Sequence, residues 1–280
     1  MLRQSKNSVR GNPRAVRVLM YHRIVDDDVL DGDPWTISTG QFRRQIERFD
    51  RNGFTAITPE DYRLFEAGEL NLPKKPIVLT FDDGYIEVYS KVFPVLKEYG
   101  MKAVVFVLAD QSKRSNVWDE ENSHPGCQLM DSTQILELHG AGFEIGSHTL
   151  THPDLTRVSQ DKAWDEISRS RMLLEILLNA PVRSFSYPFG YVNEAAKQMV
   201  KEAGYANAFG AWTGPVHYDG DPFEIRRIVV RRNFNTYRVA FMMRSPYLRY
   251  RWLWWQVKRR WQGRRAVREG GVRKNGENGE

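Results

Sequence analysis

Short apolar segments alternate along the chain with longer amphipathic segments. Short apolar runs rich in β-branched and aromatic residues are typical of buried strands, and apolar residues at helical spacing predict amphipathic helices. Strands that alternate with helices favour an α/β fold with a parallel sheet. The predicted strands are residues 15–22, 55–57, 77–81, 103–108, 143–147, 183–187, 206–210 and 224–230.

The predicted helices lie between these strands, at residues 39–52, 59–67, 85–99, 131–141, 159–178 and 193–204. Local signals support several of their ends. Thr58 is a plausible N-cap with Pro59 at the first helical position, and Gly100 follows the third helix. Residues 26–34 and 110–126 have no periodicity and are expected to be loops. A loop as long as the second is usually functional in a compact domain.

The strand at residues 77–81 is followed by Asp82, Asp83 and Gly84. Successive side chains of an extended segment point to opposite sides, so the two carboxylates can face different partners, one a metal and the other a water. Gly84 allows a sharp turn. An Asp-Asp-Gly turn without chemistry is the ordinary alternative.

A second strand, at residues 143–147, is followed by His148 and His152, with three residues between them. Two neutral imidazoles and one carboxylate form a ligand set for zinc or a similar metal, with one position left open for water. Asp83, His148 and His152 would supply that set. The chain has only six histidines, and His124, His139 and His217 are interpreted as ordinary surface or core residues.

The predicted order of elements brings distant residues together. His22, the Asp82-Asp83 pair, the two histidines and the segment 187–190 each follow the end of a predicted strand. In a closed parallel barrel all these strand ends open on one face, where the chemistry of such folds lies. The order of the strands therefore predicts a single site at that face.

The two motifs, Thr80 to Gly84 and His148 to His152, resemble those of the polysaccharide deacetylases of carbohydrate esterase family four. The resemblance extends from Val16 to Val230. It implies an irregular (β/α) barrel with fewer strands than the regular eight, and a metal-dependent N-deacetylase. It also implies that Asp82 is the catalytic base and that Asp83, His148 and His152 bind a divalent metal, expected to be zinc.

The resemblance assigns further roles in the segment Tyr187-Pro188-Phe189-Gly190. The backbone N–H of Phe189 is the expected donor to the oxyanion that forms during amide hydrolysis. Tyr187, Pro188 and Trp35 are expected to contact the substrate.

Two positions depart from the commoner family pattern. The chain has no histidine after His217, so the usual C-terminal acid is missing; a permuted subgroup carries it in a Tyr-His segment on the first strand, as Tyr21-His22 does here. His22 is therefore the predicted acid. If it is only a structural histidine, residues 119–121 are the next candidates.

The second departure concerns the arginine that usually holds the base, because Ser186 occupies its position. Arg227 is a candidate replacement. The alternative is that Arg226 and Arg227 are solvated residues at the edge of the barrel.

Composition adds constraints. The chain has 280 residues, enough for one large α/β domain and an appendage. Cys127 is the only cysteine, so an intrachain disulfide is excluded. Residues 1–14 are polar and basic, unlike a secretory signal, and are expected to be a disordered arm before a catalytic domain at 15–244. These features favour the cytoplasm.

The C-terminal region differs in charge from the rest. Residues 225–268 hold fourteen Lys and Arg and no Asp or Glu, whereas the whole chain has a net charge of +6. Residues 245–280 are expected to form a basic amphipathic helix and a disordered tail. Tryptophans and arginines within 246–265 favour an anionic membrane surface at the cytoplasmic leaflet. Alternatively, the tryptophans pack on the barrel; nucleic acid is not an expected partner.

The sequence thus predicts an enzyme that removes N-acetyl groups from N-acetylhexosamine units of a polysaccharide or a lipid-linked glycan precursor. Two alternatives stay open: hydrolysis of another amide on the same scaffold, and an inactive glycan-binding protein. The intact set of Asp82, Asp83, His148 and His152 argues against the second.

Overall fold

The computed structural model describes residues 16–29, 33–116, 118, 126–211, 220–244, 247, 250 and 253. The predicted N-terminal arm and most of the predicted C-terminal helix lie outside these residues. So do His124, His217 and residues 119–121 of the long loop.

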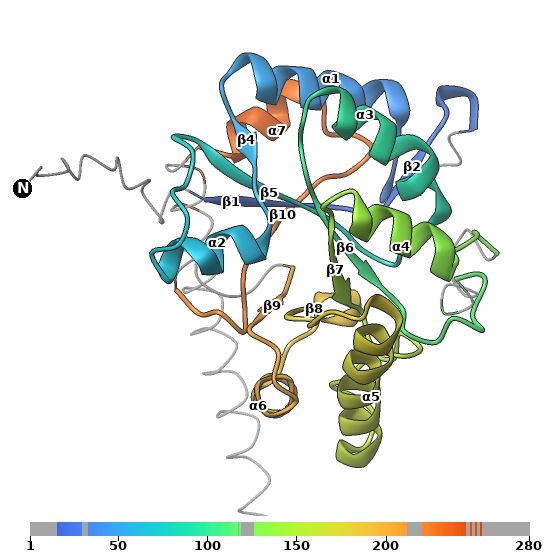
Figure 1. The fold of residues 1–280 in the computed structure, drawn as a ribbon. Coiled ribbons are helices and arrows are strands. Elements are labelled where there is room, and N and C mark those ends of the chain that lie inside the picture. Colours follow the sequence, from blue (N-terminus) through green and yellow to red (C-terminus); the bar gives the residue numbers. More distant parts are fainter. Residues whose placement is uncertain are drawn as a thin grey trace, which may run out of the picture.

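Eight of the described strands form one parallel sheet, which curls into a half-barrel (Figure 1). Its order is β10-β1-β5-β6-β7-β8-β9, and β4 also pairs with β5. The strands are β1 (Arg17–Tyr21), β4 (Thr55–Ala56), β5 (Pro76–Phe81), β6 (Val104–Val107), β7 (Glu144–Ser147), β8 (Ser184–Ser186), β9 (Asn207–Phe209) and β10 (Ile228–Val229). β1, β5 and β6 are buried along their whole length, as expected for parallel strands covered by helices.

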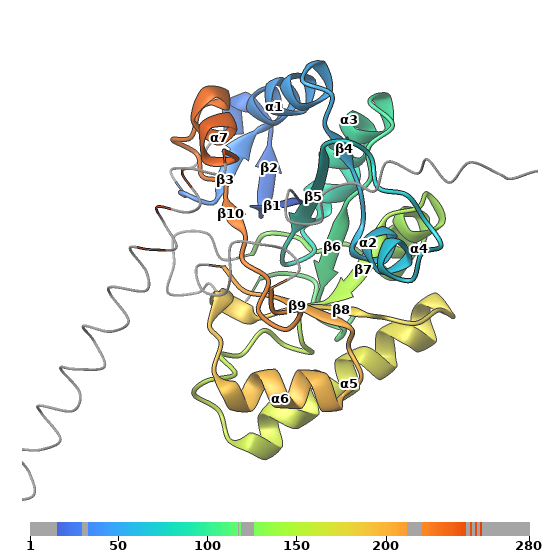
Figure 2. The same ribbon diagram turned by 90° about the vertical axis from the view of Figure 1, so that its left-hand side faces the viewer.

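Helices cover the outside of the sheet, with α1 and α7 packed together, and α5 beside α6 below β8 and β9 (Figure 2). They are α1 (Thr39–Arg51), α2 (Pro59–Glu66), α3 (Phe93–Glu98), α4 (Ser132–Gly140), α5 (Gln160–Leu178), α6 (Glu194–Glu202) and α7 (Thr236–Met242). The predicted cap holds: Thr58 accepts the N–H of Asp61 and Asp61 accepts the N–H of Thr58.

Two predicted elements need correction. The helix predicted over residues 85–99 contains a π-helical segment, η3 (Val88–Val92), before α3. Pro94 lacks an N–H, which explains why the regular hydrogen-bond ladder is interrupted just before it. The strand predicted over 224–230 is also interrupted: Ile225 bridges to Phe209 of β9, and Ile228–Val229 then pair with β1.

The sequence pattern did not predict three of the elements. The strands β2 (Arg23–Val25) and β3 (Thr36–Ser38) form a separate parallel pair, and α7 follows β10. Three-residue strands are too short to show periodicity. The short 3₁₀ helices η2 (Asp27–Val29) and η5 (Pro188–Gly190) lie in connections. Within the described residues, no helix is both long and apolar enough to cross a membrane.

Candidate active site

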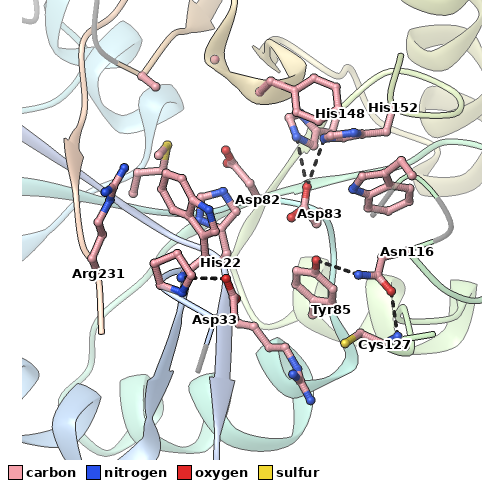
Figure 3. A pocket seen from close by; sticks show the side chains of 18 of the residues that line it. His22, Asp33, Asp82, Asp83, Tyr85, Asn116, Cys127, His148, His152 and Arg231 are labelled. Atoms are coloured by element: carbon pink, nitrogen blue, oxygen red, sulfur yellow. Dashed lines mark hydrogen bonds and ion pairs between the residues drawn. The ribbon is translucent and has the colours of Figure 1, made fainter. Parts of the chain in front are cut away.

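A cavity of about 410 Å³ opens where β1, β5, β7 and β8 end (Figure 3). Side chains from segments far apart in sequence line it. They include His22, Asp82, Asp83, His148, His152 and Phe189. The strand ends therefore meet on one face, as the sequence predicted.

The register of the sheet explains why these residues meet. Tyr21 of β1 pairs with Phe81 of β5, so His22 and Asp82 follow on neighbouring strands. Ser147 of β7 pairs with Val107 of β6, and the N–H of His148 donates to the carbonyl of Val107. His148 is therefore the first residue beyond the end of β7.

Asp83, His148 and His152 form a compact ligand set. Oδ1 of Asp83 lies 3.3 Å from Nε2 of His148 and 3.4 Å from Nε2 of His152 (Figure 3). The three side chains are buried, and one ligand atom from each lies within 4.8 Å of the others. Two imidazole nitrogens and one carboxylate oxygen that face a cavity fit a catalytic metal site with an open position.

Hydrogen bonding selects the ligating nitrogen of His148. Its Nδ1 lies 2.8 Å from the carbonyl oxygen of Ser186, which can only accept, so Nδ1 donates and Nε2 is left for a metal. Burial alone would raise the pKa of Asp83, but hydrogen bonds with His148 and His152 hold it well below its ordinary value. Asp83 is therefore ionised at neutral pH, as a ligand must be.

Asp82 is buried and bound by Arg227 in a bidentate ion pair. Nη1 of Arg227 lies 2.7 Å from Oδ1 of Asp82, and Nη2 lies 2.8 Å from Oδ2. Burial would raise the pKa of Asp82, but the Arg227 charge outweighs it, and the pKa is lowered. Asp82 is thus a carboxylate, and the bidentate contact with the Arg227 guanidinium fixes the orientation of the Asp82 side chain.

All five N–H groups of Arg227 are used. Besides Asp82, they donate to the carbonyl of Gly210 at 2.7 Å, to the hydroxyl of Thr80 at 3.1 Å and to the hydroxyl of Ser186 at 3.0 Å. The interruption of the strand explains how Arg227 enters the barrel, because Arg227 lies between Ile225, which bridges to β9, and Ile228 of β10, which pairs with β1. Ser186, at the position of the usual arginine, contacts the Arg227 guanidinium instead of carrying one.

Phe189 follows β8 in a left-handed conformation with φ 58° and ψ 2°. Phe189 is 41% exposed and lines the cavity, and its ring meets that of His152 edge-on, with ring centroids 4.6 Å apart. Gly190 is required next to it, because a Cβ there would lie 2.4 Å from Cβ of Ala211. The backbone at Gly190 therefore lies close to Ala211, and both residues line the cavity.

The three predicted substrate-contact residues differ in placement. Trp35 lines the cavity, with its ring 4.8 Å from that of His22 and with Arg231 stacked over it. Tyr187 and Pro188 are buried and do not line it. The Tyr187 hydroxyl donates to the carbonyl of Phe223. The structure gives these two residues a packing role and does not bring them to the substrate cavity.

Other lining residues were not predicted individually. Trp118 stacks on His152 with ring centroids 4.6 Å apart, and it comes from the long loop for which a function was expected. Asn116 and Tyr85 form another wall, where the Asn116 amide donates to the Tyr85 hydroxyl at 3.4 Å. The lack of periodicity around Trp118 was the available signal.

Backbone strain is concentrated at this site. Among the described residues other than glycine, five have positive φ: Asp83, Thr149, His152, Asn179 and Phe189. All but Asn179, which ends α5, belong to the segments that form the cavity wall. Such conformations persist only where surrounding contacts enforce them, and they cluster at functional sites.

Comparison with known proteins agrees with this geometry. The family model for polysaccharide deacetylase matches residues 69–208, half of the chain. YxkH of Bacillus subtilis, described as a polysaccharide deacetylase, is 26% identical over 218 residues, which are 78% of this chain and 72% of YxkH. The poly-β-1,6-N-acetyl-D-glucosamine N-deacetylase of Staphylococcus aureus is 22% identical, over 81% of this chain and 82% of that enzyme.

Solved structures agree in fold. The deacetylase PplD of Streptococcus pyogenes, in complex with acetate, superposes with a TM-score of 0.68 at 25% identity, covering 82% of this chain and 98% of PplD. A de-N-acetylase of Aggregatibacter actinomycetemcomitans superposes with a TM-score of 0.70 at 21% identity, over 81% of this chain and 98% of that chain.

Proposed function

The chain belongs to the polysaccharide deacetylase family, and from this premise we propose that it is a zinc-dependent hydrolase that removes N-acetyl groups from N-acetylglucosamine units of a glycan. The observation that carries the proposal is the compact set of Asp83, His148 and His152 beside the ionised, oriented Asp82. An inactive glycan-binding protein would not need to keep either feature.

The metal would be held by Oδ1 of Asp83 and by Nε2 of each histidine. When bound, it supplies a Lewis acid for the acetamide carbonyl and lowers the pKa of a water toward ~7. Nitrogen and carboxylate donors with an open position favour zinc among divalent metals.

The chain's own residues supply proton transfer. Asp82 accepts the proton of the attacking water, because it is ionised, does not belong to the ligand set and is fixed by Arg227. His22, on the neighbouring strand, donates a proton to the leaving amine. The N–H of Phe189 stabilises the developing oxyanion from the rim of the cavity. Arg227 acts by orienting Asp82.

Relatives suggest the substrate. The staphylococcal enzyme acts on poly-β-1,6-N-acetyl-D-glucosamine, and we propose a β-1,6-linked N-acetylglucosamine chain, free or lipid-linked, for this protein. The test is acetate release by the zinc-loaded protein from such oligomers and from a glycolipid that carries the same sugar. Release from simple amides but from neither glycan would instead favour the alternative of another amide hydrolase.

Metal-site variants complete this test. Asp83→Ala and His148→Ala should lose tight binding of one zinc ion per chain, together with activity, as measured by metal analysis of purified protein. Wild-type protein that binds no zinc while folded would refute the proposed metal dependence.

We also propose that residues 246–265 hold the enzyme on the anionic inner face of the cytoplasmic membrane. The support is the basic and aromatic sequence, together with the exposure of Tyr250 and Leu253 at its described positions. The protein should co-sediment with vesicles containing anionic lipid, and the binding should weaken with salt. Equal binding after truncation at residue 245 would exclude this surface.

A further inference from the structure

The loop that carries both histidine ligands, residues 148–152, has an unfavourable backbone. Thr149 has φ 70° and His152 has φ 64°, although neither is glycine. Within the loop, the hydroxyl of Thr149 accepts the N–H of His152 at 2.9 Å. This single contact leaves the middle of the loop, Leu150 and Thr151, to be held from outside.

Glu166 of α5 holds that middle. Its Oε2 accepts the N–H groups of Leu150 and Thr151, both at 2.9 Å, and its Oε1 accepts the hydroxyl of Thr151 at 2.7 Å. Glu166 is fully buried, whereas its ion-pair partner Lys162 is half exposed. A buried carboxylate is costly unless its oxygens are hydrogen-bonded, and here three of its partners belong to one loop.

Ser170 holds the start of the same loop. It lies four residues after Glu166 on α5 and is also fully buried, so the two share one face of the helix. The hydroxyl of Ser147 donates to Ser170 at 2.8 Å, and Ser147 in turn accepts the N–H of Thr149 at 3.3 Å. The helix therefore contacts the loop on both sides of its first strained residue.

We propose that Glu166, supported by Ser170, is a positioning residue that sets the metal affinity of the site by holding the histidine loop in its strained conformation. The proposal rests on the proposed metal site. Glu166 is neither a lining residue of the cavity nor a member of the ligand set, so it would act through His148 and His152. Residues that orient metal ligands in this way change metal affinity or activity by roughly 10–100-fold when they are removed.

The experiment measures zinc affinity by competition with a chromogenic chelator. Glu166→Ala should weaken zinc binding by about 10–100-fold. Glu166→Gln should stay close to wild type, because one amide oxygen can still accept both backbone N–H groups. Glu166→Asp, one methylene shorter, should resemble the alanine variant.

Glu175 provides a matched control on the same helix. It also accepts a backbone N–H, that of Val182 at 3.0 Å, and pairs with an arginine one turn away, Arg171. Its hydrogen bonds join it to Arg171 and Val182, and among the described residues none joins it to the histidine loop. Glu175→Ala should therefore lower thermal stability without changing zinc affinity.

The outcomes separate the two proposals. If wild-type protein binds no zinc, the proposed function fails. If wild-type protein binds zinc and folded Glu166→Ala binds it equally well, or if Glu175→Ala weakens zinc as much as Glu166→Ala does, the positioning role alone is refuted. If Glu166→Ala does not fold, the comparison of Glu166→Asp with Glu166→Gln decides, and equal zinc affinity in these two refutes the role.

Discussion

Two carboxylates at opposite ends of the sheet show how one cation changes the outcome of burial. Asp82, just past the C-terminal end of β5, is buried against Arg227, and its pKa is lowered. Glu144, the first residue of β7, accepts from the Ser184 hydroxyl and from the Glu60 N–H, and no cation among the described residues is in hydrogen-bond contact with it. Burial raises the pKa of Glu144 to about 7, and the charges of Glu60 and Asp61 add to this.

The difference separates the roles of the two ends. Burial alone disfavours the ionised form, and a guanidinium in bidentate contact reverses this. The end with the cavity thus keeps a carboxylate that can accept a proton at neutral pH. The opposite end holds a carboxyl whose pKa is raised to about 7, and we expect it to affect stability rather than turnover.

The largest expected effect comes from Asp82→Asn. It removes the base but not a metal ligand, so turnover should fall by about 10²–10⁴-fold while one zinc per chain is retained. Steady-state kinetics and metal analysis of the same sample provide the check. A folded but metal-free Asp82→Asn protein would reverse the roles assigned to Asp82 and Asp83.

His22→Ala tests whether the cavity uses a second proton-transfer group. Zinc should be retained, and turnover should fall by about 10²-fold, most for the substrate with the poorest leaving amine. The measurement is turnover on a series of substrates of differing leaving-group pKa. Near-native turnover throughout would leave His22 with a structural role only.

Arg227→Met removes the cation from the comparison. Leaving Asp82 buried and unpaired should cost about 3 kcal/mol of the free energy of unfolding. With burial unopposed, the pKa of Asp82 should rise. In the wild type, the Arg227–Asp82 ion pair contributes its full stability above the ordinary aspartate pKa. That contribution is lost only as pH falls through the lowered pKa of Asp82.

The variant should therefore lose activity at a higher pH than the wild type when pH is lowered. Urea unfolding and the pH dependence of kcat/KM measure the two effects. Arg227→Lys keeps the charge but loses the bidentate geometry, so its stability and its acid limb should lie between those of the wild type and of Arg227→Met. An unchanged acid limb in the methionine variant would show that Arg227 does not set the state of Asp82.

Glu144→Gln should have the smallest effect, on stability alone. Because the folded pKa of Glu144 is raised, its contribution to stability is full below the ordinary glutamate pKa and is lost as pH rises through about 7. Glutamine removes this loss, which amounts to about 2.5 kcal/mol between pH 5 and pH 8. Urea unfolding at both pH values measures this change in the free energy of unfolding, with Glu202→Gln at an exposed position as the control. If the free energy of unfolding changes equally with pH in the wild type and in Glu144→Gln, the prediction is wrong.

The sequence by itself predicted the parallel strands and the residues that follow them. Period and composition report burial along a strand, and the carboxyl ends of parallel strands share one face. Asp82, Asp83, His148 and His152 therefore met where expected. Local patterns could not show the pair β2 and β3, which are too short for a period, or the π-helical turn before Pro94.

Only the tertiary structure decided what supports the site. Arg227 and Asp82 are 145 positions apart in the sequence. They meet because the chain pairs with β9 just before Arg227 and with β1 just after it. Glu166 lies within an amphipathic helix, where a sequence pattern treats a charged residue as solvated, yet three hydrogen bonds to the histidine loop compensate its burial. Periodicity is a property of neighbouring residues, whereas compensation of a buried charge depends on partners that only folding brings near.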